Sequence, residues 1–245
     1  AREDFWKPFA SVVNSFKLRG SYGELGNQNT SSPYPTYQVL DIKTNAGTWL
    51  QNGKKPNITK MPGLISSTLT WECIKSWNVG IDWGLLDNRF TGSFDYFVRK
   101  TTDMVGPAPT LPKILGTAVP KTNNTDLKTY GFELNLTWQD RLKNGLGYKA
   151  TFLLSDSQTK ILAYPNPNLT IGTYTAGHLT GEIWGYETIG IAKSQEEMDA
   201  HLATLPNGGQ DKIGTKWGAG DVMYADSNKD GKIDSGSNKY DDHGD

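Results

Sequence analysis

The chain has little cysteine, little histidine, almost no net charge and no long apolar run. One cysteine, Cys73, among 245 residues excludes an internal disulfide and argues against a zinc cluster. No apolar run approaches the roughly 18 residues that a transmembrane helix needs. The net charge of −1, without a basic patch, argues against nucleic-acid binding. No Ser/His/Asp grouping, reactive thiol or phosphate-binding glycine loop stands out, so we expect no enzyme.

What the chain has instead is strict alternation of apolar and polar residues. In the clearest run, residues 77–85, Trp, Val, Ile, Trp and Leu alternate with Asn, Gly, Asp and Gly. Successive side chains of a strand point to opposite faces, so this run has one apolar and one polar face. The pattern recurs in 90–99, in 130–138, in 148–155 (where Leu153 interrupts the polar set) and, more weakly, in 16–23. An apolar band of about ten residues with a polar reverse is typical of a transmembrane β-barrel.

The lengths of the connections point the same way. Only a few residues separate the first two alternating segments, and the last two are joined by a bend at Asn144-Gly145, a dipeptide favoured in tight hairpins. The long connections are 26–70, 101–127 and everything after about 160. Outer-membrane barrels alternate short periplasmic turns with long external loops. Trp83, Trp138 and Tyr148 lie beside the short turns, where an aromatic girdle would meet the headgroups.

The sequence therefore predicts an all-β protein: an antiparallel meander of long hairpins forming part of a large transmembrane β-barrel, with long extracellular loops and one short helix. Five strands cannot close a barrel, since even small barrels need about eight, so we expect a piece of a larger protein. The alternative is a soluble antiparallel sandwich with one face on a core, which also alternates. Its functional form would be a secreted, calcium-stabilised β-sandwich that binds carbohydrate.

We expect two regions along the chain. Residues 1–160 would hold the barrel strands with their loops, and residues 161–245 a long extracellular region with a short helix and a calcium-like loop. Ser194, with Glu197 three residues on, forms a capping box for a helix from Gln195 to about Thr204. A further short strand is expected over 36–40. The acids expected on polar strand faces are Glu24, Asp82, Asp95 and Glu133.

Residues 226–234 follow the first nine positions of a calcium-binding loop. Calcium prefers six to eight hard oxygen ligands. The predicted ligands are Asp226, Asn228, Asp230, the backbone carbonyl of Lys232 and Asp234. Gly231 would permit the sharp turn and Ile233 would pack inward. Ser237 stands where such a loop has a bidentate glutamate, and Asp241 or Asp242 would replace it only if the chain folds back. A metal-free Asp/Asn/Gly turn held by side-chain-to-backbone hydrogen bonds is the alternative to a structural calcium ion.

Several segments, in the same order along the chain, resemble the SusC/RagA family of TonB-linked outer-membrane transporters. The matching segments are 16–23 with 26–28, 69–72 with 77–82, 88–90 with 95–97, 130–134 and 220–226. The resemblance implies a barrel of about 22 strands in the outer membrane of a Gram-negative bacterium, in contact with outer-membrane lipid. It implies import of glycans or peptides with a SusD-like lipoprotein, and contact with TonB through a plug and other segments that this chain lacks. It implies no catalysis.

Overall fold

A computed structural model describes residues 8–9, 12–28, 36–112, 114, 116–117 and 119–245. The chain divides into two compact units. The first, here the sheet unit, comprises residues 1–165 and 176–180, and the second, here the loop unit, comprises residues 166–175 and 181–245. Among the described residues, no helix has the length and apolar character needed to cross a bilayer.

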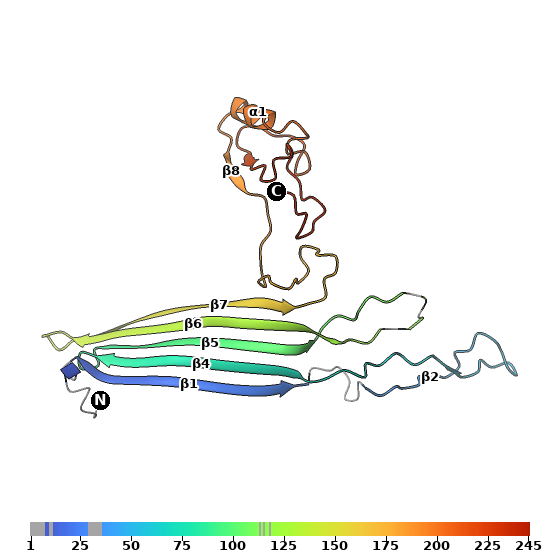
Figure 1. The fold of residues 1–245 in the computed structure, drawn as a ribbon, viewed down its shortest axis with the longest axis horizontal. Coiled ribbons are helices and arrows are strands. Elements are labelled where there is room, and N and C mark those ends of the chain that lie inside the picture. The colour runs from blue at the N-terminus through green and yellow to red at the C-terminus, as the bar shows by residue number, and fades with distance from the viewer. Residues whose placement is uncertain (1–7, 10–11, 29–35, 113, 115, 118) are drawn as a thin grey trace. The chain divides into compact units, whose positions relative to one another are not determined.

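The sheet unit is built on a five-stranded antiparallel sheet in the order β1-β4-β5-β6-β7 (Figure 1). The strands are β1 (Val13–Asn27), β4 (Glu72–Leu85), β5 (Phe90–Val105), β6 (Asn123–Arg141) and β7 (Gly147–Ala163). All five predicted strands and the meander order are confirmed. Each strand runs further toward the long connections than its apolar alternation does.

The long connection between β1 and β4 holds a separate two-stranded sheet of β2 (Ile42–Lys43) and β3 (Ile58–Thr59). The prediction of a strand over 36–40 is wrong: Thr36 and Tyr37 form a turn and a bend, and residues 38–40 are irregular. Alternation alone does not make a strand, because the backbone groups also need a partner strand. Here β3 supplies partners only to Ile42 and Lys43.

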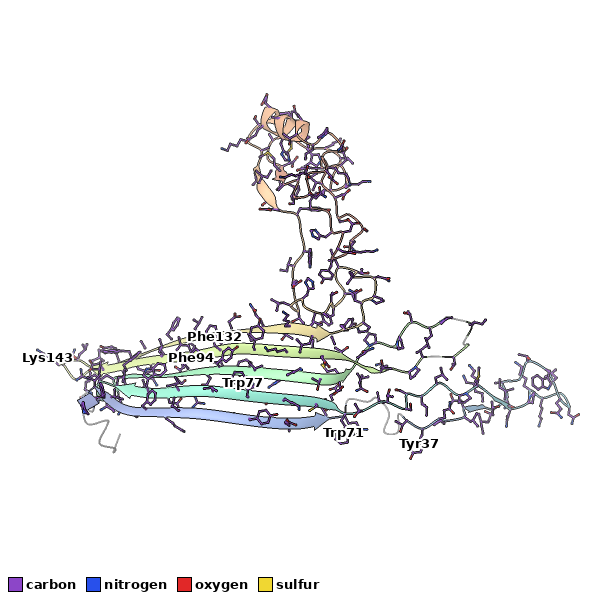
Figure 2. The ribbon with its side chains drawn as sticks, viewed as in Figure 1. Tyr37, Trp71, Trp77, Phe94, Phe132 and Lys143 are labelled. Carbon is purple, nitrogen blue, oxygen red and sulfur yellow. The ribbon has the colours of Figure 1, made fainter. Side chains whose placement is uncertain are left out.

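Two short turns lie at one end of the sheet, and the long connections leave from the other end (Figure 1). In the β4–β5 turn, Leu86, Asp87 and Asn88 have positive φ angles of 54°, 57° and 59°. The β6–β7 turn closes through a hydrogen bond from Leu142 N to Leu146 O at 2.8 Å. Gly145 has a φ of 89°, as its place in the predicted bend requires. Figure 2 shows Lys143 at the short-turn end and Trp71 at the long-connection end.

The ladder register sorts the side chains of the sheet into rows on two faces. The central apolar row is Leu18, Ile81, Phe94, Leu134 and Leu154. Phe94 and Phe132, on neighbouring strands, stack with ring centroids 6.2 Å apart (Figure 2). The apolar face is open: Leu18 is 68% exposed and Val79 is 51% exposed. An uncovered apolar face of this kind is what a barrel wall presents to lipid.

The loop unit has a small core of its own. Strands β8 (Thr188–Ile191) and β9 (Val222–Tyr224) pair, and helix α1 (Gln195–Ala203) lies between them in sequence. The buried residues Ala192, Met198 and Met223 form the core, against which Leu202 and Trp217 pack.

The predicted helix and its cap are confirmed. The Ser194 hydroxyl oxygen accepts a hydrogen bond from Glu197 N at 3.3 Å. The Glu197 carboxylate in turn accepts from Lys193 N at 2.7 Å. The first bond satisfies a donor that the helix start leaves free, and the second reaches the residue before the N-cap rather than Ser194 N itself. The helix ends at Ala203, with Thr204 as its C-cap.

Candidate functional site

The polar face of the sheet carries an ion cluster across three strands. The Arg19 guanidinium donates from Nε and Nη2 to the two carboxylate oxygens of Asp82, both at 2.9 Å. Nη2 also donates to Asp95 Oδ2 at 2.7 Å. The next strand adds Glu133, which is paired in register with Asp95. Three carboxylates against one guanidinium give this part of the polar face a net negative charge.

Gly80 makes the cluster possible. It lies between Arg19 and Asp95 in the ladder, so Arg19 must reach across it. A Cβ at Gly80 would lie 2.3 Å from Asp95 Oδ1 and 2.9 Å from Arg19 Nη2. Asp95 Oδ1 is itself buried and has no hydrogen-bond partner among the described residues. The missing side chain is therefore a requirement of the ion cluster.

We expect Gly80→Ala to destabilise the full-length protein by about 1–2 kcal/mol, because the methyl group displaces Asp95 from Arg19 at a partly exposed site. Gly20→Ala is the matched control, because a Cβ at Gly20 has nothing within 4 Å. Its effect should stay within about 0.5 kcal/mol. The measurement is equilibrium unfolding in lipid or detergent. If Gly20→Ala lost as much stability as Gly80→Ala, the effect at Gly80 would not come from disturbing the ion cluster.

A shallow hollow lies beside the ion cluster, toward the long connections. It has a volume of about 440 Å³, and its lining combines small and polar residues with Tyr22, Trp77 and Phe97. The residues that reach it from the polar face include Ser21, Gly23, Ser76, Asn78, Phe97 and Arg99. Phe97 follows Asp95 by two residues and is therefore on the same face. An aromatic ring among hydrogen-bonding side chains suits stacking against a sugar or contact with a peptide.

The expectation that Glu24 shares this polar face is wrong. Glu24 is an even number of residues from Leu18 and Tyr22, so it lies on the same face as they do, at the end of the apolar face. There it accepts a hydrogen bond from the Tyr22 hydroxyl and forms an ion pair with Lys75 at 3.3 Å. Asp82, Asp95 and Glu133 do lie on the polar face, as predicted.

Aromatic residues border the apolar face at both ends. At the short-turn end, Trp138 Nε1 donates to the Tyr148 hydroxyl at 3.3 Å, and Trp138 lies 6.2 Å from Phe90 between ring centroids. This is where the sequence predicts a girdle. A second aromatic group at the opposite end was not predicted. There the rings of Trp77 and Tyr96 pack with their centroids 5.6 Å apart. Trp77 is paired in register with Tyr22, and Tyr130 belongs to the same row of the ladder.

In the loop unit, three carboxylates meet at the predicted calcium loop, two from the loop itself and one from Asp245. Oxygen atoms of Asp226, Asp230 and Asp245 all lie within 4.8 Å of one another. Asp226 also holds the turn, because its two oxygens accept hydrogen bonds from Asp230 N at 3.1 Å and Gly231 N at 2.9 Å. Gly231 has the positive φ expected of it, 82°, and Ile233 is fully buried, as predicted.

The other predicted ligands lie differently. Asn228 Oδ1 accepts from Asp230 N at 2.9 Å. Asp234 forms an ion pair with the Lys232 ammonium, which also lies 3.3 Å from Asp230 Oδ2. Lys232, together with Gly236 N–H, lowers the pKa of Asp234 from its ordinary value of 3.8. The ionised Asp234 therefore stabilises the folded loop fully at pH values above its ordinary pKa. This stabilisation is lost as the pH falls through the lowered pKa.

Asp245 is the residue that the sequence pattern misses. The chain does fold back, as a replacement for the position-12 ligand requires. Asp242, however, accepts a hydrogen bond from the Ser237 hydroxyl and is not part of the carboxylate group. Asp245 instead accepts from Ser227 N at 3.0 Å and from Asp234 N at 3.1 Å, which holds its carboxylate beside Asp226 and Asp230. Carboxylate oxygens keep further lone pairs when they accept one N–H bond. A convergent set of hard oxygen donors of this kind suits calcium.

The sheet is a meander of long strands. One face is apolar and bordered by aromatic residues, and the other face is charged. This combination defines the class of outer-membrane β-barrel proteins. Residues 1–242 match the family described as TonB dependent receptor-like, beta-barrel. The chain belongs to this family of outer-membrane transporters. A secreted sandwich is thereby excluded as the fold.

Known relatives agree with this assignment. The TonB-dependent receptor P3 of Formosa agariphila is 26% identical over 98% of this chain and 24% of its own length. The TonB-dependent receptor SusC of Bacteroides thetaiotaomicron is 30% identical over 55% of this chain and 13% of its own length. The RagAB peptide importer in its "closed-closed" state has the same fold, with a TM-score of 0.54 and 19% identity over 91% of this chain and 25% of that one. The chain thus spans about a quarter or less of these relatives.

Proposed function

We propose that the protein to which this chain belongs imports glycans or peptides across the outer membrane together with a SusD-like lipoprotein. Membership of the TonB-dependent receptor family carries the proposal. Similarity to SusC and the shared fold with the RagAB peptide importer support a nutrient oligomer as the cargo. TonB would act through parts of the protein outside this chain.

In this function the polar face of the sheet is the lumen wall. Substrate would pass the hollow around Phe97 and the negative cluster of Asp82, Asp95 and Glu133. The described parts of the long connections, between β1 and β4 and between β5 and β6, lie at the external end, where a lipoprotein lid would contact them. No bond is made or broken by these residues, which bind and orient cargo while energy coupling occurs elsewhere.

The test is uptake by cells whose only copy of the transporter is the full-length gene. Labelled oligosaccharides and labelled oligopeptides are supplied separately, with and without a protonophore. We expect energy-dependent uptake of one of the two classes, and co-purification of a lipoprotein with the tagged transporter. Uptake of neither class by a correctly inserted protein would overturn the proposal.

Two phenylalanines on β5 provide a matched pair for the same assay. Phe97 is on the polar face, and Phe94 is on the apolar face, three residues away. At equal amounts in the outer membrane, Phe97→Ala should lower uptake several-fold because it removes a surface for stacking cargo. Phe94→Ala should leave uptake per inserted molecule unchanged. An unchanged rate in Phe97→Ala would remove the hollow from the substrate path.

We also propose a structural calcium ion in the loop unit. The convergence of Asp226, Asp230 and Asp245 supports it, and Asn228 and the Lys232 carbonyl lie in the same loop. Asp234, the fifth predicted ligand, would join only by leaving Lys232. An ion there would tie the loop to residues 244–245 and so order this part of an extracellular region.

A further inference from the structure

Four lysines form a continuous row at one end of the apolar face. The ladder pairs Lys75 with Lys100, Lys100 with Lys128, and Lys128 with Lys160. They come from four neighbouring strands, β4 to β7, and all four are exposed. Lys75, Lys100 and Lys128 each lie two residues beyond an apolar or aromatic member of that face, namely Trp77, Val98 and Tyr130. The row therefore borders the lipid-facing band.

Such a row is unfavourable without a partner of opposite charge. Like charges directly opposite each other on neighbouring strands repel. Among the described residues, Glu24 pairs with Lys75 at 3.3 Å, and no carboxylate lies within ion-pair distance of the other three lysines. The Lys128 ammonium lies 5.7 Å from the centre of the Tyr130 ring. The sheet thus presents at least three positive charges side by side that have no ion-pair partner among the described residues.

The position of the row identifies the missing charge. The lysines are at the end from which the long connections leave, and in this family that end faces outside the cell. They lie just beyond the aromatic group of Trp77 and Tyr96, at the depth where headgroups begin. At the opposite end of the apolar face, Arg89 pairs with Asp140 at 3.4 Å.

We propose that Lys75, Lys100, Lys128 and Lys160 bind the phosphate groups of phosphorylated glycolipid in the outer leaflet. The proposal rests on the outer-membrane placement of the proposed function. Lysine stems lie along apolar surface while the ammonium groups reach the polar layer. Ammonium groups bind phosphate as compact point charges. Four of them in register form a linear site that can span more than one phosphate, and it would hold a shell of anionic lipid around this sector of the barrel.

The test uses the purified full-length transporter in detergent, with diphosphoryl lipid A as the probe and phosphate-free lipid A as its neutral counterpart. Lys100→Gln/Lys128→Gln removes the two central charges but keeps a long polar side chain at each position. Lys17→Gln/Lys149→Gln removes two charges from the polar face of the same sheet and is the control. Binding is measured by native mass spectrometry and by thermal stabilisation, at low and high salt.

We expect the wild type and the control to prefer the diphosphoryl lipid, with affinity that falls as salt rises. The central double variant should bind it about tenfold to thirtyfold more weakly. Equal binding by the two double variants, or no preference of the wild type for the phosphorylated lipid, would overturn the proposal. The proposal would also be overturned if the central double variant lost the co-purifying lipoprotein but still bound the lipid, because the lysine row would then be a protein-binding surface. Lipid binding is read without transport, so its failure is distinct from a failure of uptake.

Discussion

Ile81→Arg in the full-length transporter should lower the free energy of unfolding in lipid by about 2–4 kcal/mol, as for a charge near the midplane of a barrel wall. Ile81 lies in the central apolar row, paired in register with Leu18 and Phe94. A guanidinium there faces hydrocarbon and must either lose its hydration or deform the bilayer. Leu134→Arg, in the same row, should cost a similar amount.

Asn135→Arg is the control for this prediction. Asn135 follows Leu134 directly and therefore points to the opposite, polar face. An added charge there meets water, so the cost should stay below about 1 kcal/mol. The measurement is reversible unfolding of each variant in lipid vesicles of the same composition. Equal losses in the adjacent pair Leu134→Arg and Asn135→Arg would mean that the two faces of β6 do not have the assigned environments.

The extent of the sheet shows what alternation can and cannot predict. Residues 77–85 are assigned correctly because one face of that segment meets lipid. The same strand, β4, in fact begins at Glu72. Beyond the hydrocarbon layer both faces meet water, so selection no longer alternates apolar with polar residues although the hydrogen-bond ladder continues. The lysine row lies in this zone, which explains why alternation does not reveal it.

The candidate site was predictable only where local spacing determines it. Asp226, Asp230 and Gly231 are close in sequence, and their arrangement in the turn follows from that spacing. Asp245 enters through its hydrogen bonds with Asp234, a contact of the folded loop that no motif encodes. Gly80 and Gly20 look alike in sequence, yet only Gly80 has an ion pair reaching across it. Such distinctions depend on the neighbouring strands.

Calcium should stabilise the folded loop unit by mass action if the three carboxylates of Asp226, Asp230 and Asp245 bind it. The gain is about 2.7 kcal/mol at a hundredfold excess over the dissociation constant. Without a bidentate glutamate, the affinity should be near the roughly 10⁻⁴–10⁻³ M of extracellular modules. Calorimetric titration of the full-length protein measures the affinity, and thermal unfolding with and without calcium measures the gain.

Asp230→Ala should abolish both signals, because it removes one of the three converging carboxylates. Asp245→Asn should weaken binding strongly if the folded-back carboxylate is a ligand, whereas Asp234→Asn should do so only if that residue leaves Lys232 to bind the ion. Ser237→Ala is the control, since its hydroxyl contacts Asp242 outside the group, and it should bind as the wild type does. Binding that survives Asp230→Ala, or no binding at millimolar calcium, would mean that residues 226–234 form a turn held by its own hydrogen bonds alone.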